Sequence, residues 1–156
     1  MNLRYFMASA AVALSLSAAP AWSHGLGVES AWTAATRVTG ENAAVYLTIV
    51  NEAFHVQSLL GATVAVARRV ELHQTRDGSD MKRVEIIEIP LSDKLNMQKA
   101  GFHIMLIGLK RPLIFGEKLT ITLKFGDGQV QQSSVTVSDG GPPKPAGKTP
   151  HVRAKH

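Results

Sequence analysis

The sequence predicts an all-β protein, a sandwich or barrel in a single domain. Between Val28 and Val137, short apolar runs rich in β-branched residues alternate with turn signals, which is typical of such folds. Beyond the N-terminal apolar stretch, no segment has the periodicity of a helix. With 156 residues in all, the chain is long enough to bury one hydrophobic core.

Residues 1–23 have the features of a cleaved export signal. Arg4 supplies a positive charge, an apolar run follows from Met7 to Ala19, and small residues end it near Ser23. The run is too short to span a bilayer, so we expect an exported protein with no transmembrane segment in the mature chain. The sequence has no cysteine, which excludes a lipid-modified thiol at the cleavage point, a disulfide and a blue-copper site.

The strands are expected in eight runs, each closed by turn-forming residues. The run Leu119–Phe125 alternates apolar and polar residues cleanly, and Gly126-Asp127-Gly128 turns the chain into the last strand. The Asp77-Gly78 pair predicts a hairpin between two earlier runs. The predicted strands are Ala43–Val50, Val56–Gly61, Arg68–His73, Met81–Glu88, Leu95–Gln98, Phe102–Leu106, Leu119–Phe125 and Gln129–Val137.

Two of these runs carry histidine and methionine in a pattern that can bind a metal. Successive side chains of a strand point to opposite faces, so His103 and Met105 share one face. Val70 and Leu72 occupy one face of their strand, which leaves His73 on the other face with Glu71. The predicted hairpin then brings His73 close to Met81, at the start of the next strand.

The ligand types favour Cu(I). A thioether is a soft ligand, and thioether combined with imidazole suits Cu(I), whereas zinc more often recruits cysteine, further histidines or a carboxylate. The alternative is that these side chains are ordinary core and surface residues, as single Met and His residues usually are. Met97 could be a spare sulfur near the metal, but core filling is the better interpretation.

The spacing of these residues resembles the periplasmic copper chaperones of the PCuAC family. That family has a His, then a Met, and then, after twenty-one residues, a His-x-Met. Here Met81 is followed by residues 82–102 and then by His103-Ile104-Met105. The similarity extends roughly from Trp32 to Val137. Only seven residues separate His73 from Met81, fewer than is usual in the family.

The resemblance implies a fold, a metal and a role. It implies a cupredoxin-like Greek-key sandwich over residues 24–138, with Cu(I) bound by His73, Met81, His103 and Met105. It implies a periplasmic metallochaperone, not an enzyme, that delivers copper to the dinuclear copper centre of cytochrome c oxidase. The implied protein partner is subunit II of that oxidase or another copper chaperone.

Residues 139–156 are expected to be a disordered basic tail rich in Pro, Gly and Lys. This segment carries +3 of the formal net charge of +5, so the basic pI does not indicate a basic nucleic-acid-binding face. His151 and His156 in the tail, or His24 at a new N-terminus, could form a weaker Cu(II) site. The alternative is that both ends are simply solvated chain.

Two other functions remain compatible with the sequence. The chain could be a structural or adhesive β-sandwich in which the His and Met residues are incidental. It could also be a copper enzyme, which would need an open coordination position and a substrate cleft.

Overall fold

The computed structural model describes residues 25–76, 78 and 80–143, and within them the regular structure is entirely β-strand. This confirms the predicted all-β, single-domain fold. Ten strands form one hydrogen-bonded sheet. They are β1 (Leu26–Ala34), β2 (Ala43–Asn51), β3 (Gln57–Val64), β4 (Ala67–Arg76), β5 (Asp80–Val84), β6 (Ile87–Ile89), β7 (Asp93–Asn96), β8 (Phe102–Leu109), β9 (Lys118–Phe125) and β10 (Val130–Ser138).

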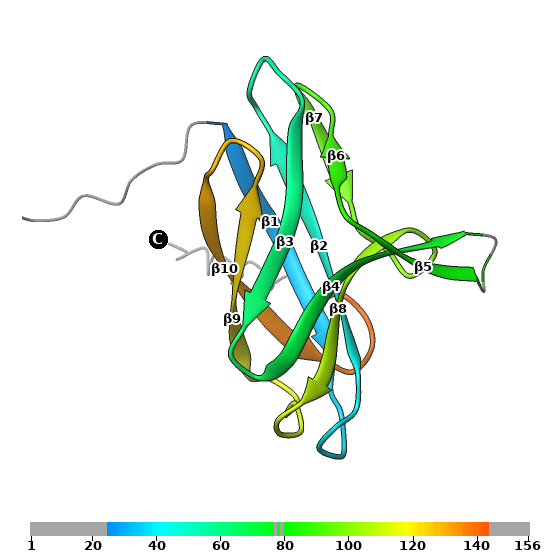
Figure 1. Ribbon diagram of the computed structural model, residues 1–156. Coiled ribbons are helices and arrows are strands. Elements are labelled where there is room, and N and C mark those ends of the chain that lie inside the picture. Colours follow the sequence, from blue (N-terminus) through cyan, green and yellow to red (C-terminus); the bar gives the residue numbers. More distant parts are fainter. Residues whose placement is uncertain (1–24, 77, 79, 144–156) are drawn as a thin grey trace, which may run out of the picture.

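The sheet folds over so that its two halves form a sandwich. Its strand order is β5-β4-β8-β2-β1-β10-β9-β3-β6, with β7 paired to β2. The single parallel pairing among the described strands joins β1 to β10, and the remaining pairs are antiparallel. In Figure 1, β10, β9 and β3 lie over the layer that contains β1 and β2. The strands that carry the candidate ligands, β5, β4 and β8, therefore lie together at one end of the strand order.

The core lies between the two layers and is built by period-two alternation. Along β2, every second residue is buried, including Leu47 and Ile49. Ile104 and Leu106 of β8 have no exposed surface, and Ile121 of β9 faces the same cluster. Burial of each such side chain stabilises the fold by about 1.5 to 3 kcal/mol relative to exposure. The opposite face of β8 is thereby left to His103 and Met105.

Most predicted strands are present, with two differences. β1 was not among the predicted runs, because its register shifts between Val28 and Ala31 and the shift interrupts its alternation. The predicted strand Met81–Glu88 is wrong as one element, since the chain leaves β4 after β5 and pairs with β3 through β6. Met97 is 5% exposed and lies in the hydrophobic core, as predicted.

The hairpin of β4 and β5 positions two of the four candidate ligands, His73 and Met81. Arg76 pairs with Asp80, which leaves a three-residue connection containing the predicted Asp-Gly pair. Gly78 has a φ of 79°, a left-handed conformation that glycine adopts without steric cost. Figure 1 shows this hairpin projecting beyond the two layers.

The expected export signal, His24 and tail residues 144–156, including His151 and His156, lie outside the described residues. Among the described residues, there is no helix with the length and hydrophobicity needed to cross a membrane.

Candidate metal centre

The four predicted ligands come from three neighbouring strands and share one face of the sheet. His103 and Met105 alternate with the core residues Ile104 and Leu106 along β8. In β4, His73 alternates with the buried Leu72 in the same way. Met81 of β5 pairs with Thr75, two residues beyond His73, and so lies diagonally across from that histidine.

The pairing of β4 with β8 places the two histidines directly opposite each other. His73 is in register with His103, and residues opposite each other in an antiparallel pair point to the same face. Their ring centroids are 5.8 Å apart, with the planes inclined at 60°. Imidazole–metal bonds are about 2.0 Å long for zinc, so one ion can reach a nitrogen of each ring. Met105 is opposite Glu71 in the same ladder, two positions from this pair.

His103 has one ring nitrogen that no protein group satisfies. The residue is 2% exposed, and its Nδ1 lies 3.2 Å from the carbonyl oxygen of Gly101. A carbonyl oxygen can only accept, so Nδ1 carries the proton and donates. The remaining nitrogen, Nε2, then has a free lone pair; it is buried and has no hydrogen-bond partner. That state of the ring is the one that binds a metal.

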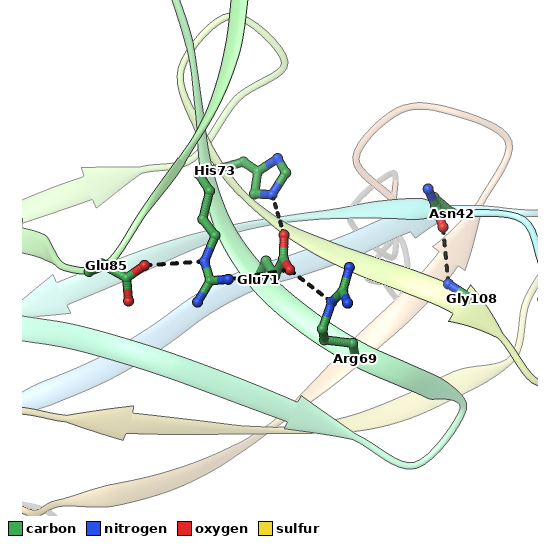
Figure 2. Close-up of polar contacts among 7 residues, drawn as sticks. Asn42, Arg69, Glu71, His73, Glu85 and Gly108 are labelled. Carbon is green, nitrogen blue, oxygen red and sulfur yellow. Dashed lines mark hydrogen bonds and ion pairs between the residues drawn. The ribbon is translucent and has the colours of Figure 1, made fainter.

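His73 has a free nitrogen too, but at the other ring position. Its Nε2 lies 2.9 Å from Oε2 of Glu71, which accepts the hydrogen bond. Its Nδ1 is buried without a hydrogen-bond partner. Figure 2 shows Glu71 between His73 and Arg69, with the carboxylate facing both. A histidine that donates one N–H to a carboxylate is the usual arrangement around a ligating imidazole.

Burial and charge set the protonation of these groups. Burial lowers the pKa of His103, the nearby His73 lowers it further, and the Gly101 hydrogen bond opposes both effects. The pKa of Glu71 is lowered mainly by the hydrogen bond from His73, and also by the charges of Arg69 and Arg83. A neutral imidazole at His103 and an ionised carboxylate at Glu71 are therefore favoured at neutral pH.

The two methionines differ in their surroundings. Met105 is partly buried on β8, a strand paired on both sides, by β4 and β2. Met81 is 48% exposed on β5, which lies at the edge of the sheet. The sulfur of Met105 is therefore held by the body of the sandwich, whereas that of Met81 is carried on the projecting hairpin.

Several residues around the candidate site were not predicted from the sequence. The sequence predicts only that Glu71 shares a face with His73, and the two-residue spacing on one strand is the signal for their contact. Tyr46 and Trp32 extend the ring contacts across the sheet. Tyr46 lies 6.1 Å from His103 and 4.8 Å from Trp32, measured between ring centroids. A row of rings, His73–His103–Tyr46–Trp32, thus crosses four strands.

The donor set of this face is suited to a soft cation. In the described part of the chain, no three His, Cys, Asp or Glu side chains gather in a way that could hold a metal ion. The candidate centre instead combines two buried, unpartnered imidazole nitrogens with methionines on the same face. Imidazole with thioether favours Cu(I).

Solved structures show the same fold. The apo PCuAC domain from PmoF1 matches with a TM-score of 0.64 and 21% identity, over 73% of this chain and 93% of that one. The solution structure of CuI-DR1885 from Deinococcus radiodurans matches with a TM-score of 0.59 and 33% identity. That match covers 76% of this chain and 83% of the other.

Sequence comparisons identify the family. A curated relative from Leifsonia xyli subsp. xyli, named "Putative lipoprotein Lxx21020", is 34% identical over 119 residues, covering 74% of this chain and 70% of the relative. The family model described as "Putative lipoprotein LpqE-like" matches residues 26–137, nearly all of the β-sandwich. The chain therefore belongs to the LpqE-like family.

Proposed function

We propose that the protein is a Cu(I)-binding metallochaperone, with His73, Met81, His103 and Met105 as the ligands. The observation that carries this proposal is the pair of buried ring nitrogens, Nδ1 of His73 and Nε2 of His103, that have no protein partner. An unsatisfied buried polar atom costs about 1 to 3 kcal/mol, which a bound cation would recover. The solution structure of CuI-DR1885, which is 33% identical to this chain, supports the choice of metal.

The proposed role is carriage and not catalysis. Four protein ligands would occupy the coordination positions of Cu(I) and leave none for a substrate. We further propose that the protein works in the periplasm after export. Its recipient would be subunit II of cytochrome c oxidase, for the dinuclear copper centre, or another copper chaperone. The PCuAC-like spacing from Met81 to Met105 supports this recipient.

A competition titration against a Cu(I) chelator tests the proposal. The chain without residues 1–23 should bind one Cu(I), and Cu(II) should bind the same site far more weakly. The double variant His103→Ala/Met105→Ala should lose tight binding. A matched double variant, His55→Gln/Met97→Leu, changes the same residue types at positions outside the four proposed ligands and should bind normally. Equal Cu(I) affinity in the two variants would contradict the ligand assignment.

Transfer to the recipient needs a separate measurement. Copper-loaded protein is mixed with the copper-free soluble domain of oxidase subunit II, the two are separated, and copper is measured in each. Net movement of copper to the oxidase domain is the expected result. Retention by the chaperone, with an independently loadable acceptor, would contradict this recipient while leaving Cu(I) binding in place.

A further inference from the structure

The environments of the two histidines differ in which ring nitrogen remains available. His103 donates from Nδ1 to the Gly101 carbonyl, whereas His73 donates from Nε2 to the Glu71 carboxylate. Both acceptors lack a proton of their own, because the carbonyl never carries one and the carboxylate is ionised. In their neutral forms the two rings are therefore held in opposite tautomers. Their free nitrogens are Nε2 in His103 and Nδ1 in His73.

The Glu71 carboxylate is itself fixed, with its two oxygens assigned to different partners. Oε1 lies 2.8 Å from Nε of Arg69 and 3.6 Å from Nη1 of Arg83. Oε2 lies 2.9 Å from Nε2 of His73. The Glu71 side chain is only 12% exposed, so few water molecules compete for these oxygens. Both guanidinium groups thus contact Oε1, whereas the imidazole contacts Oε2. Figure 2 shows the Glu71 carboxylate between Arg69 and His73.

We infer that Glu71 is a positioning residue that sets the tautomer of His73, so that copper is bound through Nδ1 of His73 and Nε2 of His103. The inference rests on the proposed Cu(I) function. Beyond that function, the inference specifies which nitrogen of each ring binds copper and which side chain determines the choice in His73. Arg83 extends the arrangement to β5, the strand that carries Met81. Through Arg83, Glu71 thereby connects His73 to the strand that carries Met81.

The inference predicts an unusual order of mutational effects. In Glu71→Gln the amide has one oxygen, which the two arginines retain because they can only donate. The amide NH2 group then faces Nε2 of His73, so this nitrogen must accept and the ring proton moves to Nδ1. In Glu71→Leu the negative charge is also lost, but the ring can still present Nδ1. The isosteric Gln variant should therefore bind Cu(I) more weakly than the Leu variant.

Nitrogen NMR of histidine-labelled, metal-free protein, above the pH range of histidine titration, reads the tautomers directly. Long-range proton–nitrogen spectra should show a proton on Nε2 of His73 in the wild type and on Nδ1 in Glu71→Gln. His103 should keep its proton on Nδ1 in both. Added Cu(I) should shift the signals of Nδ1 of His73 and Nε2 of His103. These spectra also show whether each variant is folded.

The affinities complete the test. Glu71→Gln should lower Cu(I) affinity by about 10- to 100-fold, as expected for loss of a partner that orients a ligand, and Glu71→Leu by less. The control Glu85→Gln removes a charge that contacts Arg83 but not His73, and should match the wild type.

A Glu71→Gln variant that keeps the wild-type tautomer, or binds Cu(I) at least as tightly as the Glu71→Leu variant, overturns the inference. So does copper binding at Nε2 of His73. A wild type that binds no Cu(I) overturns the proposed function instead, because the metal-free tautomers are measured independently.

Discussion

His103 combines nearly complete burial with a ring nitrogen that no protein group satisfies. It is 2% exposed, and burial lowers its pKa. Its neighbours in the row of rings, His73 and Tyr46, exclude water without providing a hydrogen bond to Nε2. Such a residue costs stability in the metal-free protein. A cation bound at Nε2 would offset this cost.

The lowered pKa of His103 predicts how the stability of the metal-free protein depends on pH. An unfolded histidine takes up a proton near pH 6.5, at a pH where folded His103 is still neutral. Below about pH 6.5 the unfolded state therefore binds more protons, and the free energy of unfolding falls as the pH falls. The loss levels off once the pH is below the folded pKa.

Urea unfolding from about pH 8 to about pH 5 measures this dependence. His103→Gln does not titrate in this range and should show a flatter profile than the wild type. His55→Gln serves as a control that removes a different histidine. A wild-type profile as flat as that of His103→Gln would show that His103 protonates equally well in the folded and unfolded states.

At the scale of elements, the proposed centre would join a strand that is paired on both sides to a projecting hairpin. β8 is paired on both sides and presents His103 and Met105 at fixed positions. β5 is an edge strand paired only to β4, and its Met81 is 48% exposed. Cu(I) tolerates three ligands, so the hairpin thioether is the one that the centre can most readily lose.

We therefore expect Met105→Ala to reduce Cu(I) affinity more than Met81→Ala. A difference of about tenfold corresponds to 1.4 kcal/mol of binding free energy. Chelator competition on the two variants and on His103→Ala measures the order. Met97→Leu controls for loss of a methionine from the core. If Met81→Ala were the most damaging of the three ligand variants, the hairpin would be the rigid part of the centre.

The elements also show how far the sequence could predict the fold and the candidate site. Alternation along β8 and β9 was sufficient to predict those strands and that His103 and Met105 share one face, because alternation is a local property. The division of Met81–Glu88 into β5 and β6 depends on a change of partner from β4 to β3, and no local pattern encodes it. The His73–His103 register likewise depends on the pairing of β4 with β8, strands that are not consecutive.

At the scale of the whole molecule, the chain continues past the last strand and lines a cavity beside Trp32. β10 ends at Ser138, whose hydroxyl donates to the carbonyl of Gly141. Gly140, Gly141 and Pro142 line a cavity of about 470 Å³ together with Trp32 and Met97. Residues up to Pro142 therefore lie beside Trp32, at one end of the row of rings, and a truncation should spare them.

Removing residues 144–156 should leave the affinity for Cu(I) unchanged and lower the uptake of Cu(II). The four proposed Cu(I) ligands all precede this segment, whereas His151 and His156 offer imidazole without sulfur, which suits Cu(II). Separate titrations of Cu(I) and Cu(II) into the full and the shortened chain measure both affinities. Loss of tight Cu(I) binding on truncation would show that the tail contributes a ligand to the main centre.

The row of rings should allow copper binding to be followed by the intrinsic fluorescence of Trp32. With residues 1–23 removed, Trp32 is the sole indole of the chain, and it contacts Tyr46, which in turn contacts His103. An ion bound to His103 should alter the packing of Tyr46 against that ring and hence the emission of Trp32. Fluorescence should then follow Cu(I) loading and saturate at one equivalent, with no such change in His103→Ala. Emission that stays constant while Cu(I) binds would show that the rings pack independently of the ion.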